Sequence, residues 1–308
     1  LLVTLVAYST AVWWLDRDSH VIDHLQRMTA PLLLATLPVS LSYVLRYQRW
    51  RGLLEQRSHT FPWGWGFIAY LAGFALTASP GKAGELLRIR YFNRFGVPAA
   101  DTLAAFVCER SLDLLIIAAL AACAASLSAF FGWAVATVLT AVFVLASLSV
   151  LDPLRVYLHR RCERLTQGWV RRTLCLLIEG TASLRLLFSP RASGEGFSLG
   201  LGAWLLTSLA FIWICEALSL HLPWPAAIGI YPLAMLLGAL SFVPGGVGTT
   251  EAGIVIMLQQ CGAPMDQAIA VAVGVRLVSL WFAVAVGMLS LALLETASRR
   301  GRIRSVTD

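Results

Sequence analysis

Residues 80–88 read PGKAGELLR and residues 244–251 read PGGVGTTE, and each stretch interrupts an apolar run of the chain. Proline ends a helix because it lacks a backbone N–H and clashes with the preceding turn, and glycine allows the tight bend that follows. The runs 62–95 and 226–261 are therefore each expected to form a helix, a break and a second helix.

The composition indicates a protein that lies in lipid. Of the 308 residues, 58% are hydrophobic and 13% are charged, whereas a soluble domain carries about 25% charged residues. The sequence predicts an all-α integral membrane protein, a single transmembrane domain over 1–308, with about six full spans of mostly apolar residues. The expected spans are 1–15, 30–45, 100–127, 131–150, 197–220 and 267–294.

Arginines indicate which side of the membrane each loop faces. The loops 128–132 and 221–225 contain no arginine or lysine, whereas arginines are concentrated in 46–60, 152–196 and the C-terminus. By the positive-inside rule, the arginine-rich segments lie in the cytoplasm. The net charge of +7 thus arises between apolar stretches, and nucleic acid is not an expected partner. The mixed composition of 152–196 fits either an amphipathic segment on an anionic lipid surface or a solvated basic loop.

The same orientation decides how the two broken runs enter the membrane. Span 100–127 leaves the cytoplasm, so the run 62–95 begins and ends on the cytoplasmic side. Span 197–220 also leaves the cytoplasm, so the run 226–261 begins and ends outside. Each run is therefore predicted to be a re-entrant helical hairpin, and the two hairpins enter from opposite faces.

The residues that follow the two breaks repeat one another at a constant spacing. Glu85, Gly96, Pro98, Ala104, Val107, Arg110 and Leu114 recur as Glu251, Gly262, Pro264, Ala270, Val273, Arg276 and Leu280. We expect two repeats of opposite topology, over 30–127 and 197–294, joined through the connection 152–196. Inverted repeats with broken helices are typical of transporters, which bind their substrate near the bilayer midplane. The alternative is an old duplication that only builds a scaffold.

Charged residues near the breaks indicate a polar site inside the membrane. A charged side chain at a helix centre costs about 2.5–3.5 kcal/mol on insertion scales, so these residues are expected to face one another or a wet cavity. Glycines allow a head group to approach the backbone, and free N–H groups at a helix start suit an anion. For any single residue the alternative is a structural ion pair. The candidate substrate-binding residues are Lys82, Gly84, Glu85, Arg88, Glu109, Arg110, Asp113, Gly245, Gly246, Gly248, Thr249, Glu251 and Arg276.

Motifs for catalysis and metal binding are missing from the sequence. It contains no Ser/His/Asp set, HExxH or P-loop. Its six cysteines form no metal-ligand spacing. We therefore expect no enzymatic activity, no cofactor and no metal site.

Four motifs occur in order along the chain: PGKAGELLR at 80–88, ERSLD at 109–113, PGGVGTTE at 244–251, and Arg276. Together they resemble the lysylphosphatidylglycerol synthase transmembrane family, which is the flippase-like membrane region of bacterial multiple peptide resistance factors and of many stand-alone proteins. The resemblance covers nearly the whole chain and implies a location in the bacterial inner membrane. In the synthases this region moves lysyl-phosphatidylglycerol and is joined to an aminoacyl transferase. Nothing up to Asp308 resembles the transferase, so synthase activity is not expected.

The leading hypothesis is a lipid flippase or transporter for an anionic or amino-acylated phospholipid, or for a polyprenyl-linked lipid. The head group would lie between the hairpin tips while the acyl chains stay in the bilayer. One alternative is a membrane enzyme, or its lipid-presenting subunit, in which Glu109 and Asp113 hold a metal. Another is a scaffold that binds partners through 152–196. Related folds include dimers, so a homodimer is left open.

Overall fold

The computed structural model describes residues 21–124 and 190–299 apart from residue 242, with scattered positions between 4 and 13 and between 132 and 160. The side chains of 80–83 and 190–193 are outside that description. So are most of the expected spans 1–15 and 131–150 and most of the expected connection 152–196.

The elements within the two long described ranges are all helical, which confirms the predicted all-α class. In chain order they are α2 (Val21–Arg27), α3 (Thr29–Glu55), α4 (Trp63–Ala72), η1 (Gly73–Leu76), η2 (Pro80–Leu87), α5 (Arg88–Arg94), α6 (Ala99–Ala124), α10 (Pro190–Ala217), α11 (Trp224–Leu240), η5 (Pro244–Gly246), α12 (Thr249–Gln260), α13 (Met265–Arg276), η6 (Leu277–Trp281) and α14 (Phe282–Arg299). The η elements are short 3₁₀ helices, except η6, a π-helical turn that joins α13 to α14.

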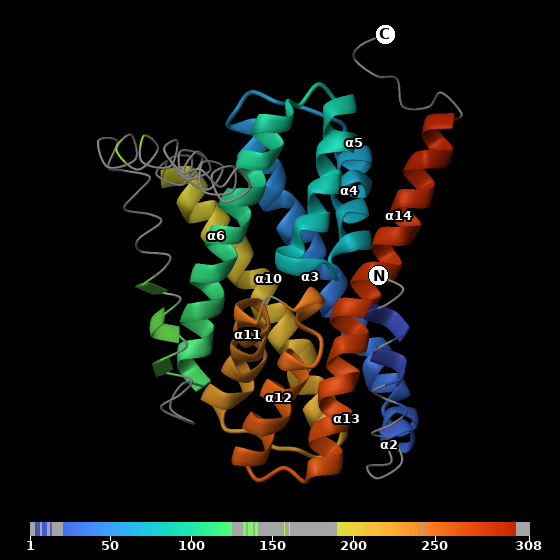
Figure 1. The fold of residues 1–308 in the computed structure, drawn as a ribbon, viewed down its shortest axis with the longest axis vertical. Helices are drawn as coiled ribbons and strands as arrows, with labels where there is room; N and C mark the ends of the chain where they lie inside the picture. Colours follow the sequence, from blue (N-terminus) through green and yellow to red (C-terminus); the bar gives the residue numbers. More distant parts are fainter. Residues whose placement is uncertain are drawn as a thin grey trace.

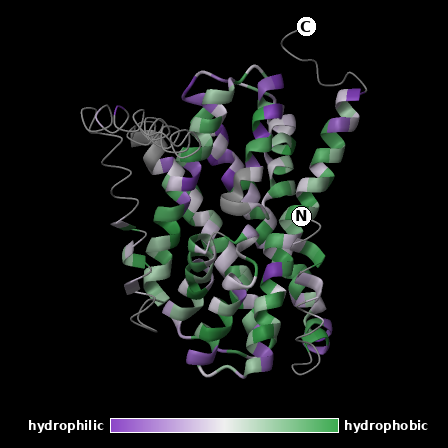
Figure 2. Ribbon diagram, in the orientation of Figure 1, coloured by the Kyte–Doolittle hydropathy of each residue, from purple (hydrophilic) through white to green (hydrophobic). Residues whose placement is uncertain are grey.

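Among the described residues, three helices are long and apolar enough to cross a membrane, namely Thr29–Glu55, Gly194–Ala217 and Met265–Arg299. Large apolar side chains such as Leu37 on α3 and Leu289 on α14 are more than 60% exposed. Figure 2 shows hydrophilic residues gathered at the two ends of the molecule and a smaller group among the helices between them. This distribution is that of an integral membrane protein.

Two helix boundaries differ from those expected. Helix α3 continues to Glu55, so the prediction of a loop from residue 46 is wrong. Arg46 and Arg49 lie within this helix, where they are 8% and 2% exposed. Helix α10 begins at Pro190, inside the expected connection 152–196. Counting charge along the sequence could not separate these buried arginines from loop arginines.

The two broken runs lie in opposite halves of the molecule as drawn in Figure 1, with α4 and α5 in the upper half and α11 and α12 in the lower half. In the first run, α4 continues into η1, and η2 follows the break and leads into α5. In the second run, η5 forms the break between α11 and α12. The breaks contact each other, because a Cβ built on Gly245 would lie 3.3 Å from the Cα of Ala78.

Small residues allow the helices around the breaks to pack closely. Helix α3 packs along α10, α11 along α6, and α14 along α4 and η1. A Cβ on Gly229 of α11 would lie 2.6 Å from the backbone nitrogen of Ala124 in α6. A Cβ on Gly287 of α14 would overlap the backbone of Phe74 and Ala75 in η1. Backbones that approach this closely gain van der Waals contact, which drives helix association in membranes.

Candidate functional site

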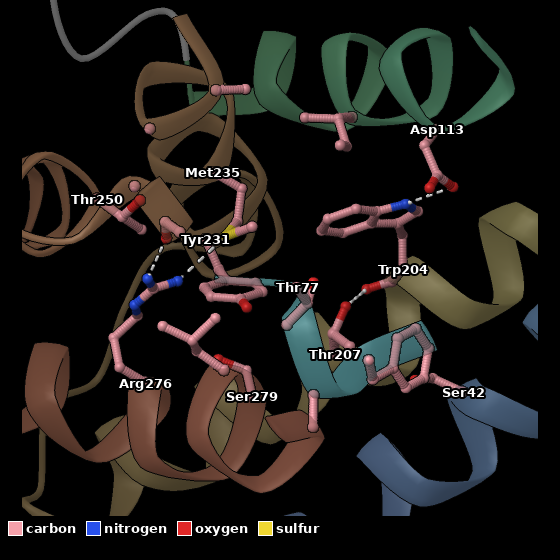
Figure 3. Close-up of a pocket in the computed structure, with 18 of the residues that line it drawn as sticks. Ser42, Thr77, Asp113, Trp204, Thr207, Tyr231, Met235, Thr250, Arg276 and Ser279 are labelled. Atoms are coloured by element: carbon pink, nitrogen blue, oxygen red, sulfur yellow. Dashed lines mark hydrogen bonds between the residues drawn. The ribbon is translucent and has the colours of Figure 1, made fainter. Parts of the chain in front are cut away.

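A cavity of about 310 Å³ lies where the two breaks meet. The first run contributes Thr77, Ser79 and Glu85, and the second contributes Gly245, Gly246 and Thr250. Helices α3, α6, α10, α11 and α13 complete the wall with residues that include Arg46, Arg110, Asp113, Trp204, Tyr231 and Arg276. Figure 3 shows Arg276 and Asp113 on opposite sides of this space. Non-helical backbone at membrane depth is tolerated where it lines such a cavity.

Glu109 of α6 is the centre of a buried charged cluster beside the cavity. Its Oε2 lies 3.0 Å from Arg88 Nη1 and 3.3 Å from Arg110 Nη2, and its Oε1 lies 3.3 Å from Arg49 Nη2. The hydroxyl of Tyr70 donates to Oε1 at 2.6 Å. The side chain of Glu109 is fully buried. Three guanidinium groups and a hydroxyl thus offset the cost of burying this carboxylate.

Asp113 lies one helical turn beyond Glu109 and faces the cavity. Its Oδ1 lies 2.8 Å from Arg49 Nη2, and its Oδ2 lies 3.1 Å from Arg110 Nη2 and 3.4 Å from Arg46 Nη1. The indole Nε1 of Trp204 donates to Oδ1 at 3.2 Å. Asp113 therefore links α6 to both α3 and α10.

Glu85 brings the first break into the same cluster. One of its oxygens lies 3.2 Å from Arg88 Nη2, and Thr77 donates to the other at 3.1 Å. Arg88 also donates from Nε to the carbonyl of Tyr70 at 3.1 Å and lies over the Tyr70 ring at 3.9 Å. Arg110 Nη2 is more distant from Glu85, at 3.8 Å. The backbone on both sides of the break is thereby fixed to α6.

Arg276 holds the second break. Its Nε donates to Glu251 at 2.9 Å, and its Nη2 donates to the carbonyl of Gly245. Gly245, Gly246 and Gly248 all have positive φ, between 64° and 84°, a conformation that only glycine adopts readily. One side chain thus ties α13 to both ends of the break.

One backbone N–H group at each break is already bound by a side chain. The N–H of Gly248 donates to Glu251 at 2.8 Å, so α12 is capped by its own side chain. In the first run, the N–H of Gly84 donates to the hydroxyl of Ser79 at 2.7 Å. These two N–H groups are therefore not free to bind an anion.

The structure brings most of the predicted residues to this site, but only some of them line the cavity. Six line the cavity: Glu85, Arg110, Asp113, Gly245, Gly246 and Arg276. Arg88, Glu109 and Glu251 lie behind them and hold them in place. Gly84 packs against Leu76, and Thr249 donates back to the carbonyl of Gly246 at 3.1 Å. The neighbouring Thr250, rather than Thr249, faces the cavity, and the side chain of Lys82 lies outside the described residues.

Several residues of the site were not among those predicted from the sequence. Arg46, Arg49, Tyr70, Thr77 and Trp204 all contact the buried carboxylates. Arg46 and Arg49 are three residues apart, and this spacing puts both on one face of α3. That spacing was the one signal for them in the sequence. The other three carry no local signal that separates them from ordinary core residues.

Within residues 21–124 and 190–299, no group of three or more His, Cys, Asp or Glu side chains is arranged to hold a metal ion. Both oxygens of Glu109 and both oxygens of Asp113 face arginines. These contacts do not favour the alternative in which the two carboxylates bind a metal.

Comparison with known proteins agrees with the four motifs. The model of the family described as lysylphosphatidylglycerol synthase TM region matches residues 1–287. A UPF0104 membrane protein from Methanothermobacter thermautotrophicus is 28% identical over 262 residues, which are 79% of this chain and 77% of that protein. Because the family match extends over most of the sequence, this chain belongs to the lysylphosphatidylglycerol synthase transmembrane family.

Proposed function

We propose that this protein moves a lipid across the membrane by holding the lipid's head group in the cavity between the two helix breaks. The observation that carries the proposal is that both breaks line one cavity together with three arginines of the surrounding helices, Arg46, Arg110 and Arg276. A cavity with charged side chains in its wall serves little purpose in a scaffold, because every charge buried in an apolar bundle opposes folding. Transporters of inverted-repeat architecture place their substrate site at such a junction of broken helices.

The lengths of the broken helices support the proposal that each run is a re-entrant hairpin. Helix α5 has 7 residues and α12 has 12, which correspond to about 10 and 18 Å of helix. The hydrocarbon core is about 30 Å thick, so neither helix spans it alone. The opposite halves that the two runs occupy in Figure 1 fit hairpins that enter from opposite faces.

The packing of the helices supports an inverted repeat. Helix α3 of the first repeat packs on α10, its counterpart in the second. The pair α6 and α11 has its own counterpart in the pair α14 and α4. A two-fold axis that relates 30–127 to 197–294 would place α4 on α11 and α6 on the helix formed by α13 and α14. The contact of α6 with α11 would then recur as the contact of α14 with α4. In the proposed cycle, rocking of one repeat against the other opens the cavity to each side in turn.

The size of the cavity supports a head group as the part that is enclosed. A volume of about 310 Å³ lies at the lower end of the range of about 300–1,000 Å³ that small-molecule pockets cover. The acyl chains would therefore remain in the bilayer. Of the two alternatives that their composition left open, the proposal favours contact of residues 152–196 with an anionic lipid surface.

Proteoliposomes that contain fluorescent lipids provide the test. A membrane-impermeant quencher is added outside the vesicles. The fluorescence of inner-leaflet lipid should then be lost faster with the protein than in protein-free vesicles, because the lipid crosses to the outer leaflet. Arg276→Gln should slow this exchange at least about tenfold, because a buried charge-assisted contact is lost. Arg90→Gln is the matched control, since Arg90 is 59% exposed and pairs with Glu295 away from the cavity. Exchange no faster than in protein-free vesicles would overturn the proposal.

A further inference from the structure

The charges buried around the cavity do not balance. Five arginines of the described residues take part in its ion-pair clusters: Arg46, Arg49, Arg88, Arg110 and Arg276. They face four carboxylates: Glu85, Glu109, Asp113 and Glu251. With every group ionised, these nine described side chains carry one positive charge in excess.

Titration cannot remove this excess. Arginine stays protonated in proteins, so the positive charges are fixed. Protonation of any of the four carboxylates would only increase the imbalance. An uncompensated charge in an apolar interior is strongly unfavourable. A bound anion would offset this excess.

Two arginines from different repeats have donors left for that anion. Arg110 uses only Nη2 in its ion pairs, and its Nε has no hydrogen-bond partner among the described residues. With 20% of its side chain exposed, it is the most accessible of the five. Arg276 uses Nε and Nη2, while its Nη1 contacts only the sulfur of Met235, at 3.8 Å. Both residues line the cavity.

Two buried hydroxyls in the cavity wall also lack partners. Thr250 is 1% exposed and Tyr43 is 7% exposed, and neither hydroxyl has a hydrogen-bond partner among the described residues. A buried hydroxyl without a partner is costly, so such groups in a native structure call for a ligand that pairs with them. The arginines and hydroxyls together require a group with one or more negative charges and several acceptor oxygens, which describes a phosphoryl group.

We propose, on the basis of the proposed function, that the transported lipid has a phosphoryl head group of net negative charge. Arg110 and Arg276 hold its oxygens from the two repeats, and Thr250 and Tyr43 donate hydrogen bonds to it. A lysyl-phosphatidylglycerol head group carries two ammonium groups and one phosphate, so its net charge adds to the excess already present. Such an amino-acylated lipid is therefore not the substrate of this chain.

Thermal unfolding of the purified full-length protein tests the lipid class without any variant. Phosphatidylglycerol should raise the unfolding temperature in detergent, because a ligand that binds only the folded state stabilises it. Lysyl-phosphatidylglycerol and phosphatidylcholine should raise it much less at the same concentration. Stabilisation by lysyl-phosphatidylglycerol equal to that by phosphatidylglycerol would overturn the inference. Stabilisation by inorganic phosphate without any by phosphatidylglycerol would overturn the assignment to a lipid.

Thr250→Val tests the position of the head group. Because the hydroxyl has no hydrogen-bond partner among the described residues, its removal should leave the unfolding temperature without lipid unchanged or higher. The affinity for phosphatidylglycerol should fall at least about tenfold, since a hydrogen bond to a charged group is lost. Thr207→Val is the matched control: Thr207 lines the same cavity, but its hydroxyl donates to the carbonyl of Trp204 at 2.7 Å. Unchanged affinity in Thr250→Val would contradict the site.

Transport measurements with the same lipids separate this inference from the proposed function. In one outcome, phosphatidylglycerol binds with an affinity that Thr250→Val lowers, while no lipid crosses the membrane. That result would refute the proposed transport function and support the anion site. If lysyl-phosphatidylglycerol crosses as fast as phosphatidylglycerol, transport stands and the anionic head group is wrong.

Discussion

Replacing Glu109 with glutamine should destabilise the protein more than any other single carboxylate-to-amide change. Glu109 is fully buried and lies within 3.3 Å of three guanidinium groups, from Arg49, Arg88 and Arg110. Glutamine fills the same space and keeps an oxygen that accepts the hydrogen bond from Tyr70. The variant therefore removes one charge while conserving the packing, and it raises the excess of buried positive charge from one to two.

The size of the effect follows from the burial of these partners. Arg49 and Arg88 have no exposed side-chain surface, so water cannot replace the lost carboxylate. Removing one partner of a buried ion pair costs about 3–5 kcal/mol. Glu295→Gln serves as the control, because its partner Arg90 is 59% exposed and surface pairs contribute about 0.2–1 kcal/mol.

Reversible unfolding in mixed micelles with increasing sodium dodecyl sulfate measures both variants against the wild type. The free energy of unfolding should fall by several kcal/mol for Glu109→Gln and by less than about 1 kcal/mol for Glu295→Gln. A loss in Glu109→Gln no larger than that of the control would show that the carboxylate does not balance the buried arginines.

Three further substitutions probe the contacts that shape the cavity. Gly287→Ala forces a methyl group into the backbone of Phe74 and Ala75 and should lower the free energy of unfolding by about 1–3 kcal/mol. Gly52→Ala is the control, because a Cβ on Gly52 has no atom within 4 Å. Equal stability of the two variants would contradict the contact between α14 and η1. Gly245→Ala meets a φ of 65° and should cost about 1–3 kcal/mol in the same assay, whereas a neutral effect would show that the break is not held in this conformation. Trp204→Phe removes the hydrogen bond to Asp113 and should cost about 1.5–3 kcal/mol; a stability equal to wild type would show that this bond is not formed in the membrane.

The positions of the breaks were predictable because they depend on local chemistry. Pro80 and Pro244 each begin a 3₁₀ segment, a position that suits a residue without a backbone N–H. Pro38 and Pro232 lie inside continuous helices, so the breaks also depend on the glycines that follow Pro80 and Pro244. The grouping of Glu109 and Asp113 was also predictable, since residues four apart share a helix face. Arg276 and Glu251 pair at 2.9 Å, which the sequence left open as one alternative for each charge.

The partners of the buried carboxylates were not predictable, because they come from distant helices. Arg46 and Arg49 follow an apolar stretch directly, so a rule based on loop charge counts them as cytoplasmic. Only the packing of α3 against α6 and α10 shows that these arginines point inward. The choice between Thr249 and Thr250 likewise depends on how α12 is rotated about its axis. A pattern of two adjacent threonines does not contain that information.

The side from which each proposed hairpin enters the membrane can be measured by labelling single cysteines, in a chain whose six native cysteines are replaced by alanine. Trp63→Cys marks the start of α4, and Trp224→Cys marks the start of α11; both positions are exposed. A membrane-impermeant maleimide should label residue 63 only from the cytoplasmic side of sealed vesicles and residue 224 only from the other side. Labelling of both positions from the same side would contradict a lipid path built between hairpins that enter from opposite faces.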